Sequence, residues 1–224
     1  MIAAHVLSVI VPTLNAASTL AETIAAVAAT AAEVVVVDAA STDATAAVAR
    51  AAGARVHTAP RGRGAQLAAG VAAAREPWLL LLHADTVLDP DWPEAAAAHI
   101  AAGPARAGYF RFALASPDPR ARRLERAVAW RCRMLGLPYG DQGLLIHRDL
   151  LAAVGGIRKL PLMEDVDLIR RLGRARIAPL PASAVTSASR WERDGWRRRS
   201  ARNLICLVAW FVGVPAERLV RWYR

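Results

Sequence analysis

The sequence has little cysteine, no long apolar run and no linker-like segment, and each absence narrows the class of protein. Its two cysteines, Cys132 and Cys206, lie far apart and belong to no Cys-x-x-Cys or Cys/His cluster, so neither a disulfide scaffold nor a structural zinc site is predicted. The longest apolar stretch, residues 204–214, is shorter than the about 20 residues that a transmembrane helix needs. Residues 1–5 lack the pattern of a secretory signal, so we expect a cytoplasmic protein in a reducing compartment.

No Ser/Gly tract or internal repeat divides the 224 residues. We therefore expect one domain over residues 1–190 and a C-terminal extension over residues 191–224 that packs on it. An apolar content of 55% supplies enough side chains for a substantial core. The net charge of +10 favours polyanionic partners, which are nucleic acid, anionic lipid head groups or phosphorylated substrates.

What the first half does contain is a regular alternation of strand-like and helix-like segments. Apolar or β-branched runs predict strands at residues 6–11, 34–38, 55–58 and 78–82, and Ala-rich stretches between them predict helices at residues 19–31, 43–52 and 65–75. Pro12 is expected to stop the first strand, and Thr19 and Glu22 to form a capping box. Because no hairpin-type turn joins these strands, we predict an α/β fold with a mainly parallel, Rossmann-like sheet flanked by helices.

The second half is less regular. Its patterns predict helices at residues 91–101 and 119–135 and strands at residues 107–114 and 144–146. Residues 163–172 (MEDVDLIRRL) predict a helix on which Asp165, Leu168 and Leu172 face the core. An inward carboxylate needs a partner or a task as proton acceptor, so Asp165 is a candidate base. The attraction of acids to a helix start explains Glu164 better.

Two acids are expected at strand ends. Asp38 and Asp85 each end a predicted strand, and such ends can converge on one crevice in a doubly wound sheet. Hard cations such as Mg²⁺ or Mn²⁺ take few protein carboxylates and add water and phosphate oxygens, so one acid can be a sufficient anchor. Plainer interpretations stay open, with Asp85 as a turn residue and Asp43 as a helix cap. A structural role is favoured over metal binding for His83.

Five segments carry a resemblance to a known family. They are residues 8–15 (SVIVPTLN), 35–43 (VVVDAASTD), 61–64 (RGRG), 83–85 (HAD) and 164–165 (ED). Their order and spacing resemble family 2 glycosyltransferases with the GT-A fold, and the likeness covers nearly the whole chain. Residues 61–66, 83–86, 140–143 and 163–168 are more particularly similar to a small bacterial subgroup found in radical-SAM/selenodomain (arsenosugar) gene neighbourhoods.

The resemblance implies a role for each matching position. The residues that would contact the sugar nucleotide are Pro12, Thr13, Asn15, Asp38, Ser41, Arg61, Gln66, His83, Ala84 and Asp85. Asp85 matches the last acid of an Asp-x-Asp motif, which binds the Mn²⁺ or Mg²⁺ that bridges the donor's diphosphate, and Asp165 matches the general base of an inverting enzyme. Gly140, Asp141, Gln142 and Glu164 would lie on the acceptor side, although from the residues alone 140–143 is a plain tight turn.

The chain also departs from the family pattern. Ala39 and Ala40 stand where the family usually has glycine-containing residues, so a left-handed backbone is disfavoured there. Ala16 stands where an acid commonly follows the Asn, and His83 replaces the first acid of Asp-x-Asp. The Gln-x-x-Arg-Trp motif of processive members is represented at best by Arg190-Trp191, which favours a single transfer.

Residues 191–224 mix tryptophan and arginine around the apolar stretch 204–214. This mixture suits a helix at a membrane surface, an amphipathic helix packed on the sheet, or a homodimer interface. Two functions follow from the whole sequence. The first is a metal-dependent, inverting glycosyltransferase that uses a nucleoside-diphosphate sugar and a small or lipid-linked acceptor, without nucleic acid. The alternative is a noncatalytic basic module that binds a membrane surface or nucleic acid.

Overall fold

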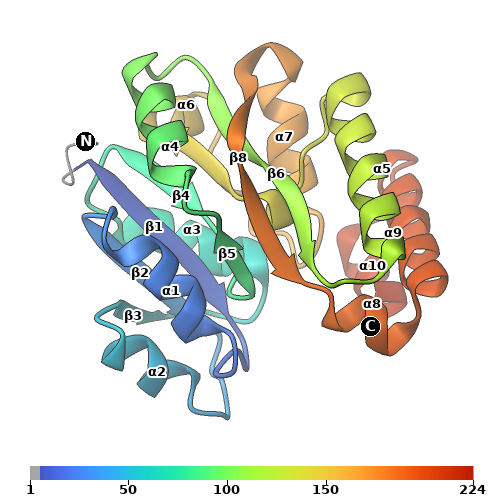
Figure 1. The fold of residues 1–224 in the computed structure, drawn as a ribbon, viewed down its shortest axis with the longest axis horizontal. Helices are drawn as coiled ribbons and strands as arrows, with labels where there is room; N and C mark the ends of the chain where they lie inside the picture. The colour runs from blue at the N-terminus through green and yellow to red at the C-terminus, as the bar shows by residue number, and fades with distance from the viewer. Residues whose placement is uncertain (1–5, 224) are drawn as a thin grey trace.

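A computed structural model describes residues 6–223, which fold around one mixed sheet (Figure 1). The first half forms β1 (Leu7–Thr13), α1 (Leu20–Ala28), β2 (Glu33–Asp38), α2 (Thr45–Ala51), β3 (Arg55–Thr58), α3 (Arg63–Ala73), β4 (Trp78–Leu81), β5 (Thr86–Leu88) and α4 (Trp92–Ala101). The second half forms β6 (Ala107–Ala115), α5 (Pro119–Leu135), the 3₁₀ turn η1 (Gly140–Gln142), β7 (Leu144–His147), α6 (Arg148–Ala153), α7 (Glu164–Leu172), the 3₁₀ turn η2 (Arg174–Arg176), β8 (Ile177–Ser187), α8 (Ser189–Asp194), α9 (Trp196–Phe211) and α10 (Ala216–Tyr223). The predicted α/β fold class is confirmed.

The sheet order is β3-β2-β1-β4-β7-β6-β8-β5. Strands β1 to β4 pair in parallel, as the continuous apolar runs of β1, β2 and β4 predict for strands buried on both faces. Strand β3 is partly exposed at the edge of the sheet. Beyond β4 the sheet becomes mixed, because β7 runs antiparallel to both β4 and β6. The parallel half therefore ends at β4, directly before His83 and Asp85.

Helices cover both faces of the sheet, and side chains of β1 alternate between the two cores. Val9 and Val11 join the core under α1, α2 and α4, while Ile10 joins the core under α3, α5, α6 and α7. Gly70 brings α3 against β1 so closely that an added Cβ would overlap the Ile10 side chain and lie 3.0 Å from Val37. This contact fixes the helix whose first turn carries Arg63.

Two local predictions were wrong. Strand β1 continues through Pro12 to Thr13, where it still pairs with β2. On its other side, β4 pairs with β1 only as far as Ile10, so no strand there needs the N–H that Pro12 lacks. The capping box at Thr19 does not form. Instead, the Thr19 hydroxyl donates to the carbonyl oxygen of Ala84 at 2.7 Å, which ties the start of α1 to the loop after β4.

Strands β5 and β8 were not predicted from the sequence. Strand β8 contains Pro179 and Pro181, which remove ladder donors and weaken the strand pattern. Its pairing with β6 shifts register between Tyr109 and Arg111, opposite these prolines. The irregularity lets an 11-residue strand form despite them.

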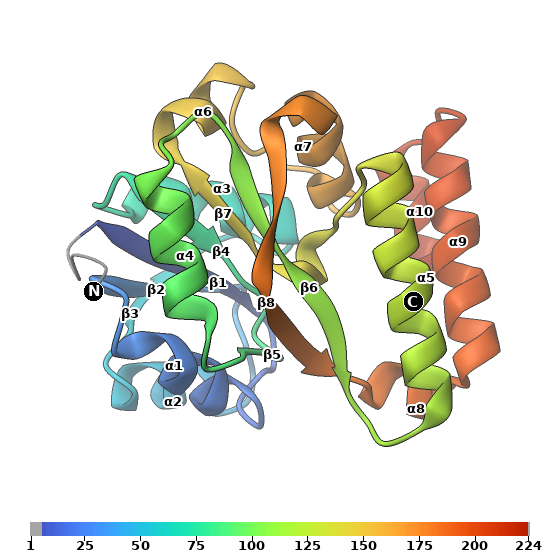
Figure 2. The same ribbon diagram turned by 45° about the horizontal axis from the view of Figure 1, so that its top comes forward.

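Helices α5, α9 and α10 lie side by side at one end of the molecule in both views (Figures 1 and 2). A small apolar core joins Cys206, Ala209 and Leu219 of α9 and α10 to Met163 and Val166 at the start of α7. Among residues 6–223, no helix combines the length and apolar character needed to span a bilayer. The division of the chain at residue 190 stays a prediction.

Candidate active site

The carboxyl ends of β1 and β2 hold residues predicted to bind the nucleotide. Parallel register sets Thr13 opposite Asp38, and the Thr13 hydroxyl donates to Asp38 Oδ1 at 3.0 Å. The Asp38 Oδ2 accepts from the backbone N–H of Ser41 at 2.9 Å. Since Asp38 is buried, its carboxylate fixes the loop after β2 at this sheet edge.

The loops after β1 and β2 interlock. The backbone N–H of Asn15 donates to Ser41 Oγ at 2.8 Å, and Asn15 Oδ1 accepts from the N–H of Thr42 at 2.9 Å. Asn15 and Ala40 have φ of 51° and 58°, in the left-handed region that alanine rarely adopts. Ala40 therefore adopts the left-handed backbone that its side chain disfavours, and the surrounding hydrogen bonds hold it there.

Three further residues of the predicted nucleotide site lie around these loops. Gln66 is buried under the strand ends, where its Nε2 donates to the carbonyl oxygens of Thr13 and Val37, each at 2.8 Å. Pro12 is buried within β1, and Arg61 is exposed on the loop before α3. Gln66 thus supports the sheet edge from below, whereas Arg61 is accessible from solvent.

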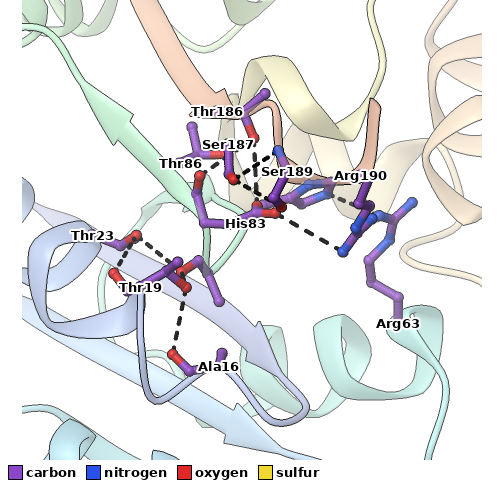
Figure 3. Close-up of polar contacts among 12 residues, drawn as sticks. Ala16, Thr19, Thr23, Arg63, His83, Thr86, Thr186, Ser187, Ser189 and Arg190 are labelled. Carbon is purple, nitrogen blue, oxygen red and sulfur yellow. Dashed lines mark hydrogen bonds and ion pairs between the residues drawn. The ribbon is translucent and has the colours of Figure 1, made fainter. Parts of the chain in front are cut away.

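Asp85 lies in the loop between β4 and β5, held in place through the backbone. Figure 3 shows its neighbours His83, Thr86 and Arg190. The preceding Ala84 carbonyl accepts from the hydroxyls of Thr19 and Thr23, at 2.7 and 3.1 Å. The Asp85 carbonyl accepts from Ser187 N at 3.0 Å. The carboxylate itself is 25% exposed, and its contacts with Thr186 Oγ1 and Arg190 Nη2 are long, at 3.5 and 3.9 Å.

Arg63, at the start of α3, joins three other predicted site residues. Its guanidinium forms an ion pair with Glu164, lies 3.4 Å from Asp165 Oδ2 and contacts His83 Nε2 at 3.1 Å. Burial opposes the Arg63 charge, but the carboxylates of Glu164 and Asp165 outweigh it and raise the pKa of the guanidinium. Burial, together with Arg63 and Arg190, holds the pKa of His83 well below its usual value, so the imidazole is neutral.

Asp165 is anchored at the first turn of α7. Its Oδ2 accepts from the backbone N–H of Gly140 at 2.8 Å, and its Oδ1 accepts from Val166 N at 2.8 Å. A Cβ on Gly140 would lie 3.0 Å from that Oδ2, so only glycine allows this close approach. Met163, with φ of 64°, turns the chain into α7 immediately before the two acids. The predicted core-facing position of Asp165 corresponds to a cavity wall, and Glu164 is more buried than expected.

The turn at residues 140–143 places one acid at the cavity and one amide beneath it. Gln142 is buried, donating to the carbonyl oxygen of Phe110 at 2.9 Å and accepting from Tyr139 N at 3.3 Å. Burial, reinforced by the Asp165 carboxylate and opposed by Arg131, raises the pKa of Asp141 to about 6. Gln142 therefore shapes the turn, and Asp141 faces the cavity.

A cavity of about 250 Å³ gathers part of the predicted site. The predicted site residues that line it are His83, Asp85, Asp141 and Asp165, and the wall also contains Arg63 and Arg190. Figure 3 shows His83, Arg63 and Arg190. Gly140 and Glu164 line a smaller adjoining space of about 30 Å³ that shares His83 and Asp165. The residues at the β1 and β2 ends lie outside this cavity, along the neighbouring sheet edge.

Asp85 suits a hard divalent cation because its carboxylate has no close ion pair among the described residues. His83 does not supplement it, since Arg63 occupies its Nε2. Within residues 6–223, no cluster of three or more His, Cys, Asp or Glu side chains has the arrangement of a metal site. The donor set therefore fits a cation that takes one protein carboxylate and obtains its other ligands from a diphosphate and water.

Sequence reasoning missed several residues of this cavity. Arg63 lies within the Arg-Gly-Arg-Gly motif, but no role was predicted for it. A Cβ on Gly64 would lie 2.5 Å from the carbonyl oxygen of Arg158, so the motif packs against a distant loop. Arg131, Tyr139 and Arg199 were also missed as cavity residues, because nothing in their spacing relates α5 to α9.

Three solved structures show a similar fold. One is described as a mycobacterial protein, with 22% identity, a TM-score of 0.56 and coverage of 82% of this chain and 65% of that one. Glucosyl-3-phosphoglycerate synthase from Mycobacterium tuberculosis, in complex with Mn²⁺, UDP and glucosyl-3-phosphoglycerate, gives 21% identity, a TM-score of 0.57 and coverage of 82% and 70%. The same synthase with Mn²⁺ and UDP-glucose gives 21%, 0.59 and the same coverage.

This chain thus spans 65% and 70% of the lengths of those two proteins, and the likeness establishes a shared GT-A architecture. A search of curated proteins found no match. The sequence profile of glycosyl transferase family 2 matches residues 8–156, which include β1 to β4, Asp38, Asp85 and the turn at Gly140. The chain belongs to glycosyl transferase family 2.

Proposed function

We propose that the protein is an inverting glycosyltransferase that moves one sugar from a nucleoside-diphosphate sugar to an acceptor hydroxyl with the help of a divalent cation. The observation that carries this proposal is the placement of two carboxylates in one cavity. Asp165 is fixed by the N–H of Gly140, and Asp85 lies at the end of the parallel sheet half with its oxygens accessible. Such an arrangement separates a proton acceptor from a cation anchor.

The donor would lie along the sheet edge formed by β1 and β2. Asn15 and Ser41, which are bonded to each other, fix the loops that would border the base and ribose, and Asp85 marks where the diphosphate would reach the cavity. A bound Mn²⁺ or Mg²⁺ would neutralise charge on the departing diphosphate. Arg190, which lies 3.9 Å from Asp85, adds a positive charge at the same place. Support for a nucleotide-sugar donor also comes from the Mn²⁺ and UDP-glucose of a structural neighbour.

Asp165 would act as the general base. The acceptor oxygen forms a bond to C1 of the sugar while the bond from C1 to the diphosphate oxygen breaks, and the nucleoside diphosphate leaves with the electron pair. Asp165 takes the hydroxyl proton. Attack from the face opposite the leaving group inverts the anomeric centre. Because the imidazole of His83 is neutral, it does not repel the guanidinium of Arg63. Arg63 therefore stays paired with Glu164 and Asp165, and this pairing holds the base in place.

A donor screen with the full chain tests this function. UDP-, GDP-, ADP- and dTDP-sugars would be added with and without Mn²⁺, and melting temperature would report binding. We expect one donor to raise the melting temperature by an amount set by its concentration relative to Kd. Asp85→Ala should remove the Mn²⁺-dependent part. Asp165→Asn should keep donor binding but lose transfer, and NMR of the product would assign the anomer.

Asp149 on α6 provides the matched control, because its side chain is 87% exposed and lies outside the described cavity. Asp149→Ala and Asp149→Asn should leave donor binding and transfer unchanged. If no donor shifts the melting temperature, the enzyme proposal is wrong and a noncatalytic basic module is favoured. Transfer retained in Asp165→Asn would show that another group accepts the proton. Retention of the anomeric configuration in the product would exclude inversion.

The likeness to the radical-SAM-associated subgroup stays a prediction.

We also propose that the face formed by α5 and α9 contacts an anionic membrane surface. Its exposed apolar side chains include Trp130, Leu204 and Val208, at 55%, 60% and 54%. Exposed arginines, including Arg126 and Arg197, accompany them, and the chain carries a net charge of +10. Apolar side chains among arginines are the combination that binds an anionic lipid interface.

Sedimentation with vesicles tests this contact. We expect binding to phosphatidylglycerol vesicles but not to phosphatidylcholine vesicles, and weaker binding for Val208→Ser, since Val208 is 54% exposed and outside the cavity. Leu14→Ser is the control, since Leu14 is 37% exposed and lies in the loop after β1. If neither vesicle binds and the protein sediments as a dimer that Val208→Ser dissociates, the face is a homodimer interface instead.

A further inference from the structure

The cavity that contains Asp85 and Asp165 extends well beyond them, toward the C-terminal helices. Its far wall is formed by Val128 and Arg131 of α5, Arg199 and Asn203 of α9, and Tyr223 of α10. The residues on α9 and α10 lie outside the segment matched by the family profile, which ends at residue 156. The part of the wall on α9 and α10 is therefore not covered by the family profile, and family membership does not give the ligand that it selects.

Polar atoms that lack partners gather on this wall. Buried side-chain atoms without a hydrogen-bond partner among the described residues include Arg131 Nη2, Tyr139 Oη, Asp141 Oδ1, Trp191 Nε1, Arg199 Nε and Asn203 Oδ1, and all six residues line the one cavity. A buried polar atom left unpaired costs about 1–3 kcal/mol, so such atoms are uncommon in a folded protein. Their concentration at one cavity indicates a site made for a polar ligand.

The types of these atoms indicate the ligand's chemistry. Arg131, Trp191 and Arg199 offer N–H groups that can only donate, and the Tyr139 hydroxyl can donate too. Obligate acceptors are fewer, with one carboxylate and one amide oxygen. A ligand that satisfies this set needs several acceptor oxygens and one or two hydroxyl donors. An anionic oxygen group attached to a hydroxylated body meets that requirement.

Both arginines are held in place before a ligand arrives. The Arg131 guanidinium stacks at 3.9 Å from the Tyr139 ring centroid, and its Nε donates to the carbonyl oxygen of Leu137 at 2.9 Å. The Arg199 side chain is 5% exposed, stacks at 4.6 Å from the Tyr223 ring centroid and reaches Asp194 at 3.4 Å. Fixed guanidinium groups bind phosphate or carboxylate with little loss of side-chain entropy.

One stripe of α9 lines the cavity with both polar and apolar groups. Arg199, Asn203 and Leu207 follow each other at four-residue spacing and therefore lie on one face of the helix. Leu124 and Val128 of α5 also line the cavity. The ligand thus meets charged donors together with carbon-rich walls, which suits a compact molecule with a short carbon skeleton.

We propose that this part of the cavity is the acceptor site and that it selects a hydroxylated molecule bearing a phosphate or carboxylate, whose anionic group contacts Arg131 and Arg199 while a hydroxyl points to Asp165. The inference rests on the proposed function, because it names the acceptor class of that same site. The anionic group can belong to a free small molecule or to a lipid head group, and the chemistry recognised is the same in both cases.

Calorimetry with a matched pair of probes tests the proposal. The full chain, saturated with UDP and Mn²⁺, would be titrated with sn-glycerol 3-phosphate, with glycerol and with inorganic phosphate. We expect glycerol phosphate to bind at least about 10-fold more tightly than glycerol, since hydrogen bonds to charged groups contribute more than neutral ones. The titration with glycerol phosphate would be repeated in the presence of phosphatidylglycerol vesicles. Weaker binding of glycerol phosphate in their presence would indicate that the site takes a lipid head group, and unchanged binding would indicate a free small molecule.

Substitutions then locate the anion. Arg199→Met should weaken glycerol phosphate binding about 10–100-fold, whereas Arg197→Met, exposed on the same helix, should not change it. Arg131→Met gives a second reading if the buried Arg199→Met variant fails to fold, and Tyr139→Phe removes a single hydroxyl from the wall. Circular dichroism and melting temperature would verify that each variant is folded.

Several outcomes would overturn the inference. If glycerol and glycerol phosphate bind with equal affinity, the site does not select an anion. The inference is also wrong if Arg197→Met and Arg199→Met weaken glycerol phosphate binding equally. If the anion binds only when UDP is left out and Arg190→Met abolishes its binding, the anion occupies the diphosphate position. Failure here is separable from failure of the proposed function. Donor binding that depends on Asp85 without anion binding rejects only the acceptor class, and anion binding without any donor binding rejects the transferase.

Discussion

Replacing Arg63 by Met should destabilise the fold through Glu164, its buried partner. Glu164 is 2% exposed, and in this variant its carboxylate loses the counter-charge that justifies its burial. The protein can escape only by protonating it. From the ordinary pKa of 4.5, protonation at pH 7 costs about 3.4 kcal/mol. Burial already raises the pKa of Glu164 in the presence of Arg63, so the expected loss in free energy of unfolding is at most about 3.4 kcal/mol. For a chain of this size a loss of about 3.4 kcal/mol lowers the melting temperature by roughly 7–14 °C.

The dependence of that loss on pH distinguishes the explanation from lost packing. At pH 5 the same protonation costs about 0.7 kcal/mol, so most of the deficit of Arg63→Met should disappear. Urea unfolding at pH 5, 6 and 7 measures it, with the exposed Arg61→Met as control. The double variant Arg63→Met/Glu164→Gln should recover about 2 kcal/mol at pH 7. A loss that stays constant across this pH range, or is below about 1 kcal/mol at pH 7, refutes the reasoning.

Three other perturbations have expected outcomes. Gly140→Ala sets a Cβ 3.0 Å from Asp165 Oδ2, and steady-state assays should give a kcat lower by about 10–100-fold with donor affinity kept. Gly70→Ala forces a Cβ onto Ile10, and urea unfolding should report a loss of about 1–3 kcal/mol. The pKa of Asp141 lies near 6, above its ordinary 3.8, so its contribution to stability falls as pH rises from 3.8 to 6. Asp141→Asn should flatten that part of the stability curve by at most about 3 kcal/mol; an unchanged curve contradicts the assignment.

The parallel half of the fold was predictable because its three inner strands, β1, β2 and β4, are mostly apolar. Valine and leucine runs identify β1, β2 and β4, and their β-branched or apolar composition leaves helix as the poorer choice. Strand β8 was not predictable, since Pro179 and Pro181 oppose a regular ladder and only the partner strand β6 makes room for them. Pairing of β7 with β4 depends on contacts between residues far apart in sequence, which periodicity does not contain.

The candidate site divides in the same way. The positions of Asp85 and Asp165 followed from a strand end and a helix face, which are local patterns. The contacts of Arg63 did not, because its partner Glu164 lies 101 residues away. Taken alone, each of these charged residues would be expected to face solvent. The cavity wall on α9 likewise depends on how the C-terminal helices fold back. The positions of individual acids could thus be predicted from nearby residues in the sequence, and the ion pairs between distant elements could not.

The left-handed backbone of Asn15, Ala40 and Met163 has a consequence for binding. These residues begin or carry the loops at the β1 end, the β2 end and the start of α7, and holding alanine in this region costs about 1–2 kcal/mol. The cost is met once, during folding, by the hydrogen bonds around Asp38 and Ser41. A ligand therefore encounters loops whose shape is already set, and its affinity is not reduced by the entropy of ordering them.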